Sequence, residues 1–199
     1  MTGAHMAVFS LLLVGVGATA HAQERPAIRA GDVVFQDSGS AQGRVIREVT
    51  GSAWSHVGLV LPHRGSLHVL EAISPVSWTP LATWLDRARG EVLVRRLPTS
   101  PSEDQVARMV EVGAAWVGRP YDARFEWGDA RLYCSELVFL VFERALGLRL
   151  AEPQRWRELD LGARGRALAR RRIGRLPPAD GPLVTPEALA SSPELISVP

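Results

Sequence analysis

A single cysteine, Cys134, is the feature that most limits how this 199-residue chain can fold. One cysteine cannot form an internal disulfide, so a packed core of apolar side chains must supply the stability. Hydrophobic residues make up 46% of the chain and charged residues 22%, which provides enough apolar material for such a core. This composition excludes a wholly disordered chain and a fibrous repeat, and the length favours one domain.

Residues 1–22 have the pattern of a secretory signal peptide. An apolar run over 6–18 is followed by Ala-His-Ala at 20–22, the small-residue pattern of a cleavage site. The run is shorter than the roughly 20 residues that cross a bilayer. No Lys or Arg precedes it, which departs from the usual pattern, and a buried N-terminal helix is the alternative. We expect a secreted or periplasmic protein whose residues 23–199 form a single domain.

The secretory pattern changes the interpretation of Cys134. In a secreted chain a lone cysteine is either an intermolecular bridge or a free reactive thiol, whereas a buried cysteine can simply pack as a small apolar residue. Apolar residues at helical spacing predict a helix from Cys134 to Leu146, which Gly147 ends. The positive end of a helix dipole lowers the pKa of a thiol. Cys134 is therefore a candidate nucleophile that still needs a base.

The remaining apolar patterns predict an α+β domain in which a small antiparallel sheet packs against helices. The polar, Gly- and Ser-rich residues 37–53 are expected to form a loop with at most one helical turn. We expect strands over 33–36, 55–61, 67–72 and 91–97, and helices over 78–88, from Ser102 to the Gly-Arg-Pro at 118–120, and after a cap at Thr185.

The two middle strands read as a hairpin, and its geometry brings a histidine to a carboxylate. With a four-residue turn at 62–65, His56 lies directly opposite Glu71 on one face of the sheet, while His68 points to the other face. A carboxylate bonded to one imidazole nitrogen fixes the tautomer and leaves the other nitrogen for a thiol, which is the logic of a catalytic triad. The alternative is an exposed cross-strand His–Glu pair.

The sequence gives little support for a metal site or for nucleic-acid binding. Zinc needs three or four closely spaced His, Cys or carboxylate ligands, and the chain offers one cysteine and scattered histidines, so no metal or cofactor is expected. All 23 basic residues are arginine, and 149–175 holds nine of them against three acids. Such a segment can contact nucleic acid or an anionic surface, or form a solvated helix face. Because only Trp156 of the six tryptophans lies within it, we expect no nucleic acid, and a weak contact with an anionic surface remains open. The role of the Arg-rich extension, residues 149–180, stays open.

Five ordered blocks within residues 29–148 resemble the YiiX/YebB-like cysteine hydrolases, which are permuted papain-like amidases related to NlpC and, more distantly, to lecithin retinol acyltransferase. In that family the strand with the histidine precedes the helix with the cysteine, the reverse of the papain order, as it does here. The blocks are GDVVF at 31–35, WSHVG at 54–58, VLEA at 69–72, GRPYD at 118–122 and YCSELV at 133–138.

The resemblance implies a permuted papain-like fold with Cys134 as the nucleophile at a helix N-terminus, His56 as the base and Glu71 as the group that orients it. Tyr121 either supports the oxyanion, positions the substrate or packs in the core. The implied activity is that of a secreted amidase or peptidase that forms a thioester acyl-enzyme with a peptide, muropeptide or lipid amide. The alternatives are an acyltransferase of the lecithin retinol type and a non-catalytic cell-envelope binding module with the same fold.

Overall fold

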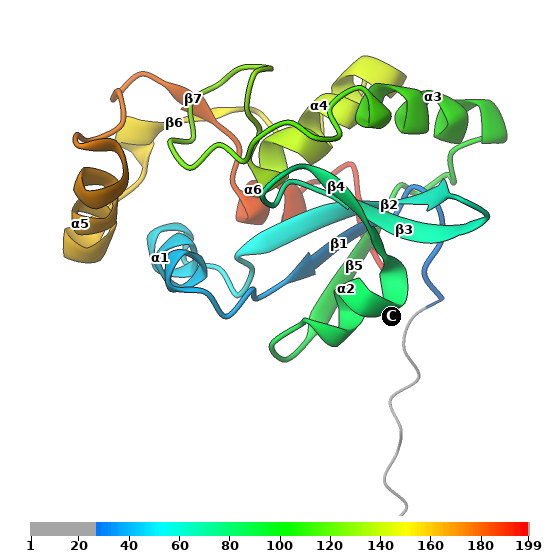
Figure 1. Ribbon diagram of the computed structural model, residues 1–199, viewed down its shortest axis with the longest axis horizontal. Helices are drawn as coiled ribbons and strands as arrows, with labels where there is room; N and C mark the ends of the chain where they lie inside the picture. Colours follow the sequence, from blue (N-terminus) through cyan, green and yellow to red (C-terminus); the bar gives the residue numbers. More distant parts are fainter. Residues whose placement is uncertain (1–26, 199) are drawn as a thin grey trace, which may run out of the picture.

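The computed structural model describes residues 27–198, so the predicted signal peptide at 1–22 lies outside the described residues. The centre of the fold is a six-stranded sheet in which every neighbouring pair is antiparallel, in the order β4-β3-β2-β1-β5-β8 (Figure 1). The strands are β1 (Val33–Gln36), β2 (His56–His63), β3 (Ser66–Glu71), β4 (Ser77–Pro80), β5 (Val92–Arg96) and β8 (Ile196–Ser197). Mixed helix and sheet with a small antiparallel sheet is the fold class that the sequence predicts.

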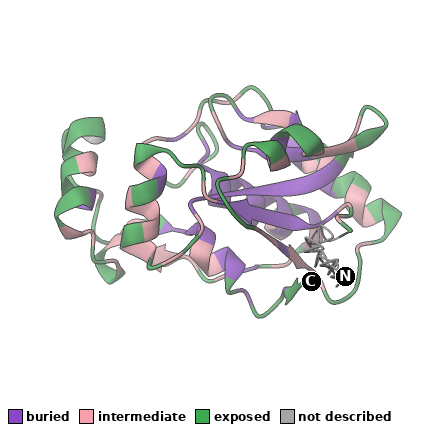
Figure 2. Cartoon of the chain, turned by 90° about the horizontal axis from the view of Figure 1, so that it is seen from below, coloured by how far each residue is buried: buried purple, intermediate pink, exposed green. Residues whose placement is uncertain are grey.

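Two helices cover one face of this sheet, and the core lies beneath them. These are α3 (Glu103–Ala114) and α4 (Cys134–Leu146), while α2 (Leu81–Asp86) packs on the opposite face. Helix α4 is apolar nearly all round, so it is buried along most of its length, as Figure 2 shows for the sheet and the helix over it. Each fully buried Leu or Phe contributes about 1.5–3 kcal/mol, which makes α4 the anchor of the fold.

Three predicted helix boundaries agree with the structure, whereas α3 ends at Ala114, before the Gly-Arg-Pro at 118–120 where its end was expected. Ser102 caps α3 by accepting the Gln105 N–H at 3.3 Å, while the Gln105 side chain accepts the Ser102 N–H at 2.8 Å. Gly147 ends α4 in the left-handed conformation, with φ of 67°. Thr185 caps the short α6 (Pro186–Ala190), where its hydroxyl accepts the Ala188 N–H at 3.0 Å.

The hairpin forms, but the predicted register is wrong. The turn has two residues, Arg64 and Gly65, whose φ angles of 49° and 81° suit the tight turns that join twisted strands. Leu59 therefore pairs with Leu70, and every partner moves by two positions from the predicted register. Because side chains alternate with a period of two, a shift of two residues leaves each one on its predicted face.

Two segments differ from the prediction in their secondary structure. Residues 41–50 form helix α1 (Ala41–Thr50) instead of a loop, with Ser40 accepting the Gly43 N–H at 2.8 Å and Gly51 ending it at φ of 64°. Val45, Ile46 and Val49 give this helix an apolar side, which lines a pocket, and only Gly43 is buried. The expected helix over 78–88 begins as strand β4 and continues as α2, because Pro80 separates the two.

The Arg-rich extension folds into its own small unit of secondary structure at one end of the molecule (Figure 1). It contains β6 (Gln154–Arg155), a 3-10 turn at Trp156–Glu158 and α5 (Gly162–Ile173), and β6 pairs with β7 (Pro182–Leu183). Helix α5 packs beside α1, far along the chain from it. Among residues 27–198 no helix is long and apolar enough to cross a membrane.

Candidate active site

Cys134 is the first residue of α4, and the chain around it is firmly held. Tyr133 precedes it in an extended conformation, and its hydroxyl accepts the Val184 N–H at 3.1 Å. The Ser135 hydroxyl donates to the Val184 carbonyl at 2.7 Å. These two bonds fix the N-terminus of α4 against the segment before α6. The thiol, 3% exposed, receives hydrogen bonds from the backbone N–H groups of Val57 and Ser135.

The His56 side chain contacts groups on both faces of the sheet. It is the first residue of β2 and pairs with Gln36 of β1 on one side, whereas β3 ends at Glu71 before reaching the position opposite His56. The ring is therefore free to contact groups from both faces at this end of the sheet. Its Nε2 lies 2.6 Å from Glu71 Oε2 on the α2 face, and its side chain also hydrogen-bonds the Cys134 thiol from the α4 face. Since Nε2 is bonded to Glu71, Nδ1 is the nitrogen left for the thiol.

Glu71 is the most heavily bonded side chain of the group. It is fully buried, which excludes the exposed cross-strand pair considered from the sequence. Its Oε1 accepts the Thr79 hydroxyl at 2.5 Å and the Arg87 guanidinium, and its Oε2 accepts Trp84 Nε1 at 3.1 Å besides His56. Gly58 lies opposite Glu71 by the same register, and the strands are packed closely there: a Cβ on Gly58 would lie 2.2 Å from Val69 Cγ1 and 3.6 Å from Glu71 Cβ.

The electrostatics of the three groups favour a thiolate–imidazolium pair. Burial alone opposes charge on His56, but the hydrogen bonds and charges of Cys134 and Glu71 outweigh it and raise the pKa of His56 to about 9. Burial likewise opposes the thiolate, yet His56 and the two backbone N–H groups lower the pKa of Cys134. For Glu71, burial is overcome by His56, Thr79 and Arg87, and its pKa falls to about 2.

Tyr121 is brought beside Cys134 by a backbone bridge. Tyr121 forms a β-bridge with Leu132, which lies two residues before Cys134 in the sequence. The loop between Tyr121 and Leu132 therefore begins and ends at neighbouring positions. The Gln42 amide Nε2 lies 2.8 Å from the Tyr121 hydroxyl, and Gln42 Oε1 accepts from the Arg172 guanidinium. Because arginine has only donors, it fixes the Gln42 amide so that Nε2 donates to Tyr121. The hydroxyl hydrogen of Tyr121 is then free for another acceptor. Burial, and next the charge of Cys134, raise the pKa of Tyr121, so it stays protonated.

An apolar pocket opens beside the thiol. It measures about 770 Å³ including its open mouth. Helix α1 forms one wall, and α5 together with the turn at 156–159 forms another. Cys134, the loop at 123–125 and the segment at 183–186 complete the lining. The apolar residues facing the pocket include Val45, Ile46, Val49, Phe125, Trp156, Leu159, Leu161, Leu168 and Leu183.

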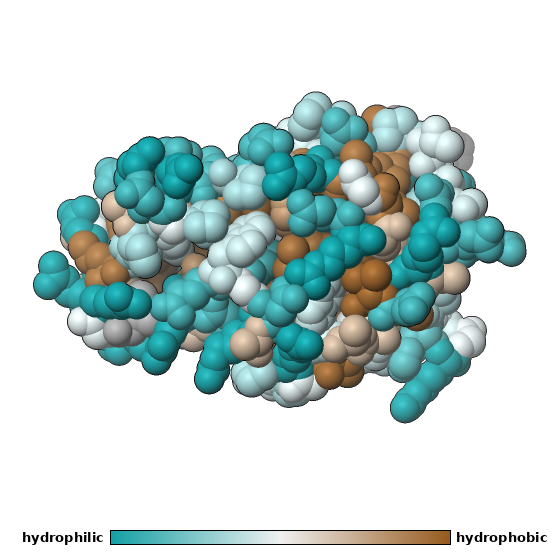
Figure 3. Space-filling view, turned by 90° about the horizontal axis from the view of Figure 1, so that it is seen from above, coloured by the Kyte–Doolittle hydropathy of each residue, from teal (hydrophilic) through white to brown (hydrophobic). Residues whose placement is uncertain are grey.

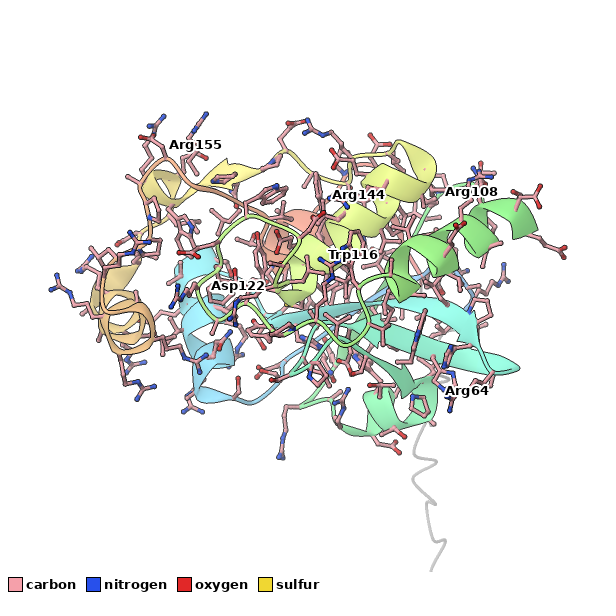
Figure 4. The ribbon with its side chains drawn as sticks, turned by 45° about the horizontal axis from the view of Figure 1, so that its top comes forward. Arg64, Arg108, Trp116, Asp122, Arg144 and Arg155 are labelled. Carbon is pink, nitrogen blue, oxygen red and sulfur yellow. The ribbon has the colours of Figure 1, made fainter. Side chains whose placement is uncertain are left out.

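The loop at the pocket edge is organised by two buried carboxylates. Asp122, labelled in Figure 4, lies in this loop. It accepts the N–H groups of Arg124 and Glu126 at 2.9 and 2.5 Å. Glu136, in the first turn of α4, accepts the N–H groups of Gly128 and Tyr133 at 3.0 and 3.4 Å. Burial, with smaller effects of Asp122 and Asp129, raises the pKa of Glu136 to about 8. Glu136 is therefore mainly protonated at neutral pH, and it holds the loop instead of contacting the thiol.

Several groups around the site were not found by the sequence reasoning. Tertiary packing alone brings them to the site, and no local motif marks them, although Trp84 lies 13 residues from Glu71 in the predicted helix. These groups are Gln42, Thr79, Trp84, Arg87 and Arg172.

Comparison with known proteins identifies the family. Residues 27–198 match the family model described as permuted papain-like amidase enzyme, YaeF/YiiX, C92 family. The uncharacterized protein YiiX of Escherichia coli K12 is 35% identical over 170 residues, which covers 84% of each chain. A crystal structure of YiiX from Escherichia coli O157:H7 superposes with a TM-score of 0.82 at 35% identity, covering 86% of this chain and 96% of that one.

The Escherichia coli O157:H7 protein is described as a metalloprotein. In this chain, residues 27–198 contain no group of three or more His, Cys, Asp or Glu side chains placed to hold a metal ion. The donor set of these residues therefore does not fit the usual structural or catalytic metal sites.

Proposed function

Because the chain belongs to the permuted papain-like amidase family, we propose that it is a cysteine hydrolase in which Cys134 is the nucleophile, His56 the acid–base group and Glu71 the orienting carboxylate. The observation that carries the proposal is the continuous hydrogen-bonded series from the thiol through the imidazole to a buried carboxylate. A binding module with the same fold would need none of the three groups, and burying a carboxylate without a function is costly.

The reaction follows from the positions of the protons. The Cys134 thiolate attacks the carbonyl carbon of the amide, and the carbonyl π electrons move to the oxygen. When the tetrahedral intermediate collapses, the C–N bond breaks and the His56 imidazolium gives its proton to the departing amine. Neutral His56 then takes a proton from water, which attacks the thioester. The C–S bond breaks, the carboxylic acid leaves, and the thiolate–imidazolium pair is restored.

The oxyanion needs donors beside Cys134. Backbone N–H groups at the start of α4 supply one set, and the free hydroxyl hydrogen of Tyr121 supplies another. Loss of one oxyanion donor typically reduces kcat by about 10²–10³. Tyr121→Phe should therefore lower kcat by about that factor with little change in the pH profile of thiol labelling. A kcat within about twofold of the parent protein would restrict Tyr121 to packing.

The pocket favours one of the predicted substrate classes, an amide with an apolar acyl chain. A peptide or muropeptide would bring many polar groups, and burying each without a partner in a wall of Val, Ile, Leu and aromatic side chains would be unfavourable. An alkyl chain gains about 0.8 kcal/mol for each buried CH₂ group. We therefore place a lipid amide at this site, in an envelope location consistent with the predicted signal peptide.

Thiol labelling tests the catalytic assignment directly. Iodoacetamide should modify Cys134 well below the ordinary thiol pKa of about 8.5, and His56→Ala should move the labelling profile back to that value. The site is then tested with long- and short-chain N-acyl amino acids, with acyl-Cys134 measured by mass spectrometry. Labelling like that of a free thiol would overturn the assignment. Transfer of the acyl group to an added alcohol or amine in preference to water would indicate the acyltransferase instead.

A further inference from the structure

Helix α5 has two different sides. Its inner side carries Gly165, Leu168 and Ala169, which line the pocket. Its outer side is exposed and carries four arginines around two alanines, at helical spacings that place all six on one half of the helix. These exposed residues are Ala163, Arg164, Arg166, Ala167, Arg170 and Arg171.

The positive charge on this outer side is only partly balanced. Helix α5 contains no acidic residue. Arg164 lies 3.3 Å from Glu48 and Arg166 lies 3.9 Å from Asp160, and both contacts are exposed and therefore weak. Arg170 and Arg171 have no ion-pair partner among residues 27–198. Two free guanidinium groups thus project beside each other into solvent, at the end of the molecule that α5 occupies in Figure 1.

From this arrangement we infer that the outer side of α5 docks on an anionic lipid surface. Guanidinium groups form bidentate hydrogen bonds with phosphate oxygens, and the small alanine side chains between them allow the helix to lie close to the headgroups. Leu176, two residues after the Gly174 cap of the helix, is 38% exposed, so an apolar side chain is available near the C-terminal end of α5. At this end of the molecule Figure 3 shows apolar areas surrounded by hydrophilic side chains.

A nucleic acid is the weaker partner for the same charges. Single-stranded nucleic acids are held by aromatic side chains that stack on the bases, together with arginines. Residues 159–177 contain no aromatic residue at all. Moreover, an apolar pocket directly behind the basic surface has no use in binding a polyanion.

The position of the pocket gives the docking a consequence. The inner side of α5 forms a pocket wall while the outer side would contact the headgroups, so about one helix diameter, roughly 10 Å, separates the membrane surface from the pocket. An amphiphilic substrate could then pass from the bilayer to Cys134 without crossing much water. The docking itself does not require catalysis, so it is tested separately from the proposed function.

Vesicle co-sedimentation of the chain with the Cys134→Ser substitution provides the test. We expect binding to phosphatidylcholine vesicles containing about 30% phosphatidylglycerol, little binding to pure phosphatidylcholine, and weakening by added salt. The double variant Arg170→Gln/Arg171→Gln should bind about 25-fold more weakly, from about fivefold for each arginine. A matched control is Arg64→Gln/Arg108→Gln, which removes the same charge at the opposite end of the molecule from α5 (Figure 4).

The affinity of the control variant for the anionic vesicles should fall by less than about twofold, since its two arginines lie outside the docking surface. Equal losses in both variants would show a response to net charge and would overturn the docking surface, as would equal binding to neutral and anionic vesicles. Tighter binding to a single-stranded oligonucleotide than to the vesicles would assign the surface to nucleic acid. Circular dichroism of each variant, compared with that of the parent protein, verifies that the fold is retained.

Discussion

Replacing Glu71 with Gln removes one charge from the centre of the site while keeping the shape of the side chain. Glu71 accepts four hydrogen bonds, two at each oxygen, and a Gln amide keeps only one oxygen. The oxygen is better retained toward His56 and Trp84, because a rotated Thr79 hydroxyl can accept from the new NH₂ group. Arg87, whose side chain is 42% exposed, can turn to water.

The magnitudes follow from these contacts. The bonds from His56 and Arg87 lose their charge assistance, and a hydrogen bond to a charged group contributes about 1.5–3 kcal/mol. With Arg87 resolvated, we expect a loss of about 2–3 kcal/mol, or about 4–12 °C in Tm for a chain of this size. The pKa of His56 should fall from about 9, since one of the groups that raise it is gone. Less thiolate–imidazolium pair remains, and kcat should drop by about 10³–10⁴.

The assay measures kcat, Tm and the pH profile of thiol alkylation for Glu71→Gln and for Thr79→Val. The second substitution removes a contact to the same carboxylate but keeps its charge, so it should reduce stability by about 1–2 kcal/mol and kcat by less than tenfold. Near-normal turnover in Glu71→Gln would reduce the site to a Cys–His dyad. Equal losses of kcat in the two variants would mean that the carboxylate acts only through stability.

Three further changes test the surroundings of the site. His56→Ala should abolish turnover and slow alkylation near neutral pH, whereas His68→Ala, on the opposite face, should leave both within about twofold. Burial raises the pKa of Glu136 to about 8 from its ordinary 4.5, so between these pH values the folded chain holds a proton that the unfolded chain releases. As the pH rises through this interval, the contribution of Glu136 to the free energy of unfolding in urea should therefore fall by roughly 1.4 kcal/mol per pH unit. Glu136→Gln should flatten this decline. Gly58→Ala should destabilise by about 1–3 kcal/mol through its contact with Val69, and the double variant with Val69→Ala should be more stable in urea than the sum of the two single changes predicts.

The parts of the fold that the sequence predicted are those with strong local signals. Helix α4 begins and ends at the predicted residues, because a continuous apolar pattern and Gly147 mark it independently of the rest of the chain. Helix α1 was missed because the polar, Gly- and Ser-rich composition of residues 37–53 favoured a loop. Its three apolar residues, Val45, Ile46 and Val49, do lie at helical spacing, and they line the pocket.

The contact between His56 and Glu71 was predicted through an argument that contained an error. The turn length was wrong, yet His56 and Glu71 meet because a two-residue error in register preserves the face of every side chain. A one-residue error would have separated them. No local sequence pattern predicted the environment of Glu71. Thr79, Trp84 and Arg87 contact this carboxylate only because β4 and α2 pack against it in the folded chain.

The two helices that were not among the expected elements, α1 and α5, form two walls of the pocket, while β2, β3 and α4 were all expected. This division follows from what each part must do. Attack on an amide fixes the thiol, imidazole and carboxylate within hydrogen-bond distance, so their residue types and spacing are restricted. An apolar wall requires only side chains of suitable size, and many sequences satisfy that. One link between the two parts is a pair of hydrogen bonds, from Arg172 to Gln42 and from Gln42 to Tyr121, through which a wall helix orients a hydroxyl close to Cys134. Under the proposed mechanism, substrate that displaces α5 would alter the proposed oxyanion donor as well as the pocket, so binding of the proposed acyl chain would be coupled to the chemistry at Cys134.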